Sequence, residues 1–291
     1  MDLHDIKPMN KNKTPFDLIQ TSLIQKIPEN VYSYLPRKWE KIGDVLILKL
    51  PLELNDYKKQ IAKTYANILH CSSVLLDKGG INGALRIPDT DLIFGNENTE
   101  TIHRENGVRF ALDPAKVMFS SGNMNERKRM SRIVHRNETV VDLFAGIGYF
   151  TIPMAVHSKP DHIIACEINP VSYQYLCKNI LLNDVSDIVK PLLGDSKKIA
   201  PKDTADRVIM GYFGNTIQFL STAVECLKNQ RGIIHFHDTF PDEDIPKIPM
   251  DLIEKKLVQF QRMAKLLQIQ KVKTYAPGIS HYVFDIAVEK L

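Results

Sequence analysis

The stretch Val140-Val-Asp-Leu-Phe-Ala-Gly-Ile-Gly-Tyr-Phe150 decides the fold of this chain. Residues 139–143 are apolar enough for a buried strand, and Gly146-Ile-Gly148 predicts a tight turn into a helix. Glycine allows a positive φ and lets a ligand approach the main chain closely. The stretch therefore predicts a strand, a ligand-binding turn and a helix in succession.

A second predicted strand, residues 162–166, ends on Glu167. A carboxylate at this point suits a ribose diol, because it accepts hydrogen bonds from both hydroxyl groups. The order of these elements is typical of an adenosine-binding α/β domain. The glycine pair alone is weak evidence. It lacks the third glycine of the dinucleotide fingerprint and the Gly-Lys-Ser/Thr ending of a phosphate-binding loop.

Three predicted strands end at an acidic residue. These are Asp142, Glu167 and Asp195, and the last of them precedes Ser196. Together with Gly146, this set resembles a class I methyltransferase that uses S-adenosylmethionine. The alternative is an ordinary α/β domain whose acids only cap helices.

Composition excludes several classes of protein. The chain has 291 residues, 44% of them hydrophobic, and a net charge of +4, which permits nucleic acid as a partner without requiring it. Its four cysteines contain no Cys-x-x-Cys pair, so a reducing cytoplasm is expected, with no disulfide framework and no cysteine zinc site. No apolar run reaches the ~20 residues that span a bilayer, and no secretory leader is expected.

The chain is predicted to have three parts. Residues 1–38 form an N-terminal extension, residues 39–118 a small α+β domain, and residues 119–291 the domain with the S-adenosylmethionine-binding pattern. A hairpin is expected to turn at Asn106-Gly107. From about residue 123, strands and helices alternate, which predicts a mostly parallel sheet. A long helix at residues 248–267 and an antiparallel strand pair are predicted to complete an α/β class I methyltransferase-like fold with seven strands.

The helix before the first of these strands is expected at residues 125–135 and is basic. Lys128, Arg132 and Arg136 follow one another at intervals of four and would share one helical face. Such a row suits the phosphate backbone of a nucleic acid. The alternative is a solvated helix face.

Two further groups have the chemistry for binding. Ser120 and Arg127 are suited to the carboxylate of a methionine-like group, because arginine pairs with carboxylates bidentately. His235 and His237 alternate on the fifth predicted strand ahead of Asp238, so their side chains share a face. They could begin a metal site or make hydrogen bonds at the strand end. Hydrogen bonding is favoured, since no further histidine or cysteine stands nearby at ligand spacing, and no metal is expected.

The fourth strand is informative because it lacks an expected motif. Enzymes that methylate nucleobase nitrogens commonly place Asn/Asp-Pro-Pro-aromatic or Asn-x-Pro here, where its carbonyls orient the amine. This chain has Met210-Gly211-Tyr212 instead. The chain therefore has the residues typical of cofactor binding but lacks the motif that positions a nitrogen for methylation.

A more specific resemblance rests on several motifs. They are Thr101-Ile-His-Arg-Glu-Asn-Gly107, Asp113-x-x-Lys116-Val-Met-Phe-Ser120, Glu126-Arg127, Asp142-Leu-Phe-Ala-Gly-Ile-Gly-Tyr-Phe-Thr-Ile-Pro153 and Glu167-Ile-Asn-Pro170. They are similar to two related tRNA enzymes, the guanine-37 N1-methyltransferase and the archaeal-type aminocarboxypropyltransferase of wybutosine synthesis. Asp206-Arg-Val-Ile-Met-Gly-Tyr212, Ile234-His-Phe-His-Asp238 and Tyr275-Ala-Pro-Gly278 resemble the second enzyme. The methyltransferase would also have Pro-Arg at Ser121-Gly122.

This resemblance implies transfer of the aminocarboxypropyl group of S-adenosylmethionine to 4-demethylwyosine at position 37 of phenylalanine tRNA, in the anticodon loop. Ser120 and Arg127 would hold the methionine arm, Glu167 the ribose, and Asp195 with Ser196 the adenine. The residues that would bind the tRNA are Lys128, Arg132 and Arg136, and the domain at residues 39–118 would help to position it. Tyr212 and His237 are catalytic candidates by location only. A monomer is expected, with no membrane partner. A guanine-37 methyltransferase and a non-catalytic tRNA-binding protein remain alternatives.

Overall fold

The structure is a computed structural model that describes residues 13–83 and 85–291. Residue contacts divide it into two compact units. The first holds the described residues up to His103 together with Asp113–Phe119. The second holds Arg104–Leu112 and Ser120–Leu291. Residues 1–12 of the predicted N-terminal extension lie outside the described residues.

The first unit is an α+β fold with a four-stranded sheet in the order β1-β2-β3-β4. Its elements are α1 (Pro15–Leu23), β1 (Glu40–Ile42), β2 (Val45–Leu48), α2 (Lys58–Leu69), β3 (Ser73–Asn82) and β4 (Ile87–Gly95). Thr14 begins α1 as half of a capping box with Asp17. Phe16, Ile19 and Leu23 join the same buried cluster as β2 and α2. The described part of the predicted extension therefore packs with this small unit.

A hairpin of β5 (Thr101–Glu105) and β6 (Val108–Leu112) follows, as predicted. Asn106 and Gly107 at its turn both have positive φ, the conformation that two-residue hairpin turns require. The Asn179 side chain exchanges hydrogen bonds of 2.7 and 3.2 Å with the backbone of Ala111. These contacts tie β6 to the second unit, although the predicted domain boundary places the hairpin in the first.

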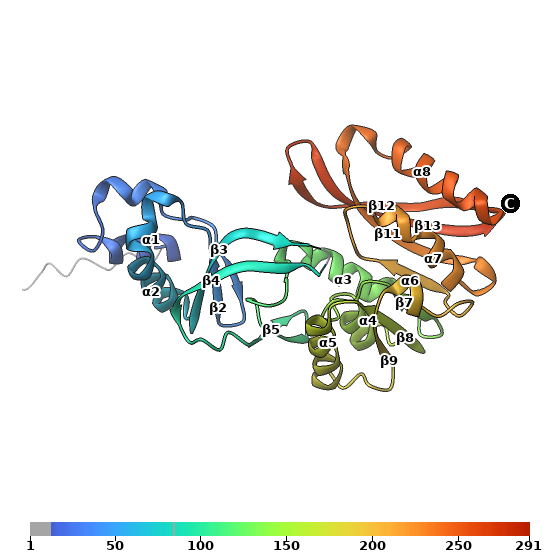
Figure 1. Cartoon of the computed structure of the whole chain (residues 1–291), viewed down its shortest axis with the longest axis horizontal. Coiled ribbons are helices and arrows are strands. Elements are labelled where there is room, and N and C mark those ends of the chain that lie inside the picture. Colours follow the sequence, from blue (N-terminus) through green and yellow to red (C-terminus); the bar gives the residue numbers. More distant parts are fainter. Residues whose placement is uncertain (1–12, 84) are drawn as a thin grey trace, which may run out of the picture. The chain divides into compact units, whose positions relative to one another are not determined.

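The second unit is a seven-stranded sheet in the order β12-β13-β11-β10-β7-β8-β9 with helices around it (Figure 1). Strands β7 to β11 pair in parallel, and β13 is antiparallel to both of its neighbours. This is the predicted class I methyltransferase-like arrangement. Its elements are α3 (Met124–Ile133), β7 (Thr139–Asp142), α4 (Thr151–His157), β8 (His162–Glu167), α5 (Pro170–Leu182), β9 (Val189–Leu193), α6 (Ser196–Ile199), β10 (Arg207–Met210), α7 (Leu220–Cys226), β11 (Gly232–Pro241), α8 (Lys247–Leu257), β12 (Arg262–Ala276) and β13 (Ile279–Lys290).

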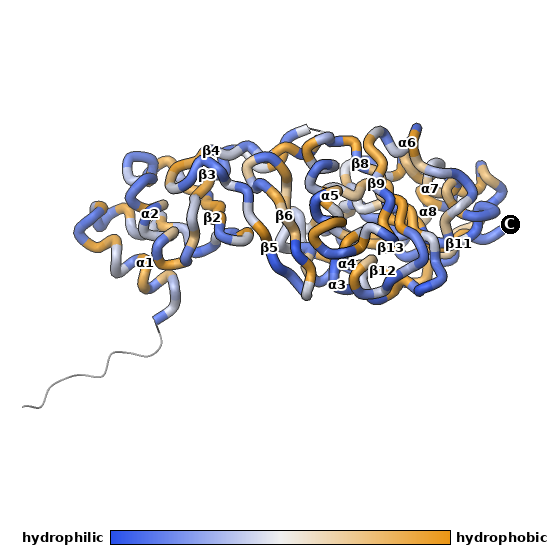
Figure 2. The backbone as a smooth tube through the Cα atoms, turned by 90° about the horizontal axis from the view of Figure 1, so that it is seen from below, coloured by the Kyte–Doolittle hydropathy of each residue, from blue (hydrophilic) through white to orange (hydrophobic). Residues whose placement is uncertain are grey.

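The predicted helix at residues 248–267 is wrong in its second half. Helix α8 ends at Leu257, and a short 3₁₀ segment leads to Gln261, whose φ of 55° turns the chain. The following residues form β12, because pairing along β13 outweighs their local helical preference. Strand β13 is buried along residues 280–286, and apolar residues recur along it (Figure 2). It lies between β11 and β12, so β12 is the edge strand of the sheet.

Candidate cofactor and substrate site

The glycine turn after β7 lies at the carboxyl ends of the parallel strands. The amide of Ala145 donates to the carbonyl of Cys166 at 2.9 Å, which joins the turn to β8. Gly146 and Gly148 have φ values of 58° and 97°. A Cβ on Gly148 would lie 2.5 Å from the side chain of Ile152. The turn therefore requires glycine for its conformation and its packing.

Asp142 stabilises the glycine turn through side-chain hydrogen bonds. Its side chain is fully buried and accepts hydrogen bonds from the Thr151 hydroxyl at 2.8 Å and the Phe144 amide at 3.2 Å. Burial raises the pKa of Asp142 to about 6, and the nearby charge of Glu167 adds to the rise. These contacts give Asp142 a bracing role. Its direct contact with a cofactor stays a prediction.

Glu167 ends β8 with both carboxylate oxygens engaged by backbone amides. One oxygen accepts from Gly146 at 2.7 Å, and the other accepts from Asn169 at 2.6 Å. Burial raises the pKa of Glu167, while these hydrogen bonds oppose the rise. The carboxylate is thus fixed beside the glycine turn, where the sequence predicts the ribose site.

Asp195 lies close by, because Leu193 pairs with Glu167 across β8 and β9. The Asp195 side chain caps α6 by accepting from the Lys197 amide at 3.0 Å, and Ser196 is buried. Two exposed apolar residues, Ile168 and Leu193, flank these acids. Sequence reasoning missed both. The sequence feature that could have indicated this is the apolar Ile168 directly after Glu167.

Arg127 is paired with Glu105, a residue that sequence reasoning did not connect to it. Its Nε donates to Glu105 Oε1 at 2.7 Å, and its NH2 donates to Oε2 at 2.5 Å, with both side chains buried. NH1 donates to the Ser120 carbonyl at 2.8 Å. The Ser120 hydroxyl instead contacts Lys273 Nζ at 2.7 Å. The predicted contact of Arg127 with a substrate carboxylate stays a prediction, since this guanidinium already has a carboxylate partner.

The loop after β10 has a fixed shape. Both oxygens of the Asp238 carboxylate accept backbone hydrogen bonds, from Gly214 at 3.0 Å and from Thr216 at 3.1 Å. The Tyr212 ring stacks on Phe144, with ring centroids 5.1 Å apart. Asp238 therefore orders the loop that stands in place of the missing Asn-x-Pro motif. The catalytic role of Tyr212 stays a prediction.

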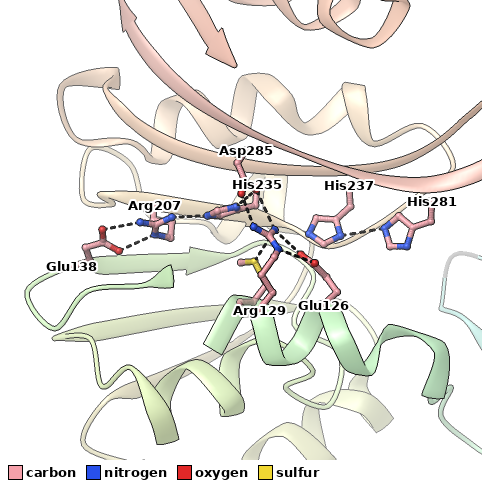
Figure 3. Close-up of polar contacts among 9 residues, drawn as sticks. Glu126, Arg129, Glu138, Arg207, His235, His237, His281 and Asp285 are labelled. Carbon is pink, nitrogen blue, oxygen red and sulfur yellow. Dashed lines mark hydrogen bonds and ion pairs between the residues drawn. The ribbon is translucent and has the colours of Figure 1, made fainter. Parts of the chain in front are cut away.

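A chain of buried ion pairs fixes α3 against the sheet (Figure 3). Arg129 Nε donates to Glu126 at 2.9 Å, and Arg129 NH1 donates to Asp285 at 2.6 Å. His235 Nδ1 lies 2.6 Å from Asp285, and its Nε2 lies 2.7 Å from Arg207. His235 is therefore held by hydrogen bonds, as the sequence favours, but not at a strand end, because β11 continues to Pro241.

His237 and His281 form a second buried contact, with His237 Nδ1 and His281 Nε2 3.2 Å apart (Figure 3). The other ring nitrogens, His237 Nε2 and His281 Nδ1, are buried without a hydrogen-bond partner in the described part of the chain. Burial lowers the pKa of His237 well below its usual value and that of His281 to about 4. Both rings are therefore neutral. The catalytic role of His237 stays a prediction, and in this structure the side chain is buried.

We expect His281 to make folding sensitive to acid. Because its pKa is about 4 in the folded chain against 6.5 as the ordinary value, the unfolded chain takes up this proton first as the pH falls. Wild type should therefore lose about 2 kcal/mol more stability than His281→Leu between pH 8 and pH 5. Urea unfolding at both pH values measures this difference. The same substitution at the exposed His162 is the control, and equal losses in wild type and His281→Leu would contradict the expectation.

The three basic residues assigned to tRNA are all exposed, but they do not share one helical face. Helix α3 ends at Ile133, where Val134 turns to an extended conformation. Lys128 and Arg132 lie on the helix, and Arg136 lies beyond it. The predicted helix at residues 125–135 is therefore two residues too long at its end.

No metal-binding group of three or more histidine, cysteine or acidic side chains occurs within residues 13–83 and 85–291. In the same part of the chain, no helix has the length and apolar character needed to cross a bilayer.

Comparison with known proteins assigns the family. A family model described as the TRM5/TYW2 methyltransferase domain matches residues 101–266, more than half of the chain. A second model, the TYW2 N-terminal domain, matches residues 19–99. The chain belongs to the TRM5/TYW2 family.

Members of the TRM5/TYW2 family with both chemistries are similar to this chain. A tRNA(Phe) (4-demethylwyosine(37)-C(7)) aminocarboxypropyltransferase from Methanocaldococcus jannaschii is 43% identical, covering 87% of this chain and 99% of that protein. The crystal structure of Pyrococcus horikoshii TYW2 in complex with MeSAdo has a TM-score of 0.85 and 37% identity, covering 94% of this chain and 98% of that one. A tRNA (guanine(37)-N(1))-methyltransferase, Trm5b of Pyrococcus abyssi, is 35% identical, covering 91% of this chain and 79% of that protein.

Proposed function

We propose that this chain transfers the 3-amino-3-carboxypropyl group of S-adenosylmethionine to C7 of 4-demethylwyosine at position 37 of phenylalanine tRNA. The observation that carries this proposal is the 43% identity to the Methanocaldococcus jannaschii aminocarboxypropyltransferase over nearly its whole length. Guanine-37 N1-methylation is the second candidate, because Trm5b is 35% identical. Met210-Gly211-Tyr212 favours the first candidate, since these residues replace the motif that orients a nitrogen acceptor.

The donor fits the residues around the glycine turn. When bound, S-adenosylmethionine supplies a carbon attached to a sulfonium, so that bond formation to C7 breaks this carbon–sulfur bond, releases methylthioadenosine and frees the C7 proton. Glu167 would hold the ribose, and Asp195 with Ser196 would lie at the adenine, between Ile168 and Leu193. The chain selects the reaction by aiming one carbon at the base, since reacting atoms must lie about 3–3.5 Å apart and in line.

The methionine arm is the part of the donor that must be aimed. We assign Ser120 to its carboxylate, with Lys273 supplying positive charge through the 2.7 Å contact with the Ser120 hydroxyl. Arg127 would act indirectly, because it donates a hydrogen bond to the Ser120 carbonyl and so fixes the position of Ser120. Glu105 neutralises the charge of Arg127. This division of roles keeps Arg127 in the donor site as a positioning residue.

Lys273→Met should therefore weaken binding of S-adenosylmethionine by roughly tenfold, the effect of losing one charge-assisted hydrogen bond. Methylthioadenosine should bind as tightly as it does to wild type, because it lacks the aminocarboxypropyl arm. Calorimetry with both ligands measures the split. Lys265→Met, at an exposed lysine on the same strand, is the matched control. Parallel loss of both ligands would remove Lys273 from the arm site.

The function is tested with S-adenosylmethionine labelled either in the methyl group or in the carboxyl carbon. Each is incubated with phenylalanine tRNA that carries guanosine or 4-demethylwyosine at position 37. We expect carboxyl label in the 4-demethylwyosine tRNA alone. Methyl label in the guanosine tRNA would make the chain a methyltransferase. Label in neither, together with no binding of S-adenosylmethionine, would leave the non-catalytic tRNA-binding protein.

Assignments on the RNA side belong to the same proposal. The exposed charges of Lys128, Arg132 and Arg136 suit phosphate groups of the anticodon stem. The small N-terminal unit would help to place that stem. We propose a cytoplasmic monomer, in keeping with cysteines that the described structure leaves unpaired.

A further inference from the structure

A continuous row of aromatic rings leads away from the glycine turn. Phe150, which closes that turn, lies 5.1 Å from His237, and His237 lies 5.3 Å from His281 between ring centroids. His281 contacts Phe213 at 5.3 Å, and Phe213 contacts Tyr275 at 6.0 Å in an edge-to-face arrangement. The row thus connects the predicted donor site to the β12–β13 turn.

The two ends of this row differ in exposure. Phe150, His237 and His281 are buried, whereas Tyr275 is 63% exposed. Phe213 lies between these extremes and belongs to the loop that Asp238 orders. Beyond the exposed end, a Cβ on Gly214 would meet no atom within 4 Å. The exposed end is therefore a preformed aromatic surface with open space beside it.

The charge of the row suits a neutral aromatic ligand. The low pKa values of His237 and His281 keep the interior of the row uncharged at neutral pH. Lys273, two residues before Tyr275, pairs with His281 across β12 and β13 and so brings a positive charge to the edge of the row. A flat uncharged ring joined to a phosphate backbone matches both features.

We propose that the acceptor base of the tRNA stacks on the exposed ring of Tyr275, which Phe213 holds in place by its edge-to-face contact. This inference rests on the proposed function and identifies the residues that position its acceptor. A carbon acceptor has no amine hydrogens for a loop carbonyl to orient, so its placement must come from the flat faces of the tricycle. An unstacked base gains stacking on aromatic side chains in return for leaving its neighbours. Lys273, two residues before Tyr275 on β12, contacts Ser120 at 2.7 Å, so a base on Tyr275 would lie beside the residue assigned to the methionine arm.

The test compares binding of two anticodon stem-loop RNAs to the full chain, one with 4-demethylwyosine at position 37 and one with no base there. Tyr275→Ala should lower affinity for the base-bearing RNA by roughly tenfold to a hundredfold, the range for losing one stacked base. It should leave affinity for the abasic RNA within about twofold. Tyr275→Phe, which keeps the ring, should bind like wild type. Tyr275→Leu, which is apolar but not flat, should bind like Tyr275→Ala.

Matched variants separate stacking from other causes. Val258→Ala removes a side chain of similar exposure, 58%, from the same unit and should change neither affinity. Phe213→Leu should repeat the loss seen at Tyr275. Wild-type affinity of Tyr275→Leu for the base-bearing RNA would overturn the proposal, and so would equal losses for both RNAs, which would indicate a general RNA or protein contact. Base-dependent binding without transfer of label would reject the proposed reaction and keep the stacking surface.

Discussion

Replacing Glu167 with glutamine should weaken binding of S-adenosylmethionine and methylthioadenosine alike, by roughly a hundredfold. Both oxygens of this carboxylate accept backbone amides, from Gly146 and from Asn169. A glutamine has one acceptor oxygen, so its NH₂ group would face one of these N–H groups without a hydrogen bond. The variant loses a charged acceptor for the ribose and also loosens the glycine turn.

Calorimetry with the two ligands separates this effect from an effect on the methionine arm. Both ligands contain the adenosine that Glu167 is proposed to hold, so their affinities should fall together. Glu225→Gln, on the surface of α7, is the control for losing one negative charge. If Glu167→Gln bound both ligands within about threefold of wild type, the ribose assignment would be wrong.

Sequence alone predicts the parts of the site that depend on local spacing. The glycine turn and Glu167 are recognisable because a strand, a turn and a second strand bring them together along a short piece of chain. The hairpin turn at Asn106-Gly107 is recognisable for the same reason, since its two residues need positive φ.

The rest of the site depends on partners that are distant in the sequence. Lys273 reaches Ser120 from 153 residues away, on a strand whose first residues were predicted as helix. Arg127 has the right chemistry for a carboxylate, but nothing in its local sequence shows that Glu105 occupies it. Pairing between β12 and β13 positions Lys273, and burial of an ion pair determines the partner of Arg127. Neither interaction produces a periodic pattern that can be recognised in the sequence.

Asp285→Asn should lower the free energy of unfolding by about 3 kcal/mol at pH 7. The Asp285 carboxylate accepts from Arg129 NH1 at 2.6 Å and lies 2.6 Å from His235 Nδ1, with contacts on both oxygens. An asparagine would direct its NH₂ group at one of these donors, inside a network that is largely shielded from water. Urea unfolding measures the loss, and Asp251→Asn, at an exposed site on α8, is its control.

The sign of the pH dependence follows from the partners of Asp285. Burial alone would raise the pKa of Asp285, but a hydrogen bond from His235 and the hydrogen bond and positive charge of Arg129 hold it well below its usual value. Its contribution is therefore complete above the unfolded pKa of about 4 and is lost as the pH falls further. The stability gap between wild type and Asp285→Asn should narrow below pH 4. A constant gap down to pH 3 would mean that the carboxylate charge does not stabilise the network.

Loss of this network should also change ligand binding, because Arg129 belongs to α3, the helix that carries Arg127 and follows Ser120. If Asp285→Asn allows α3 to shift, the Ser120 carbonyl loses its fixed distance from Arg127, and the methionine arm loses its position. Affinity for S-adenosylmethionine should then fall more than affinity for methylthioadenosine, as in Lys273→Met. Equal affinities in wild type and Asp285→Asn would mean that the network stabilises the fold without positioning the donor.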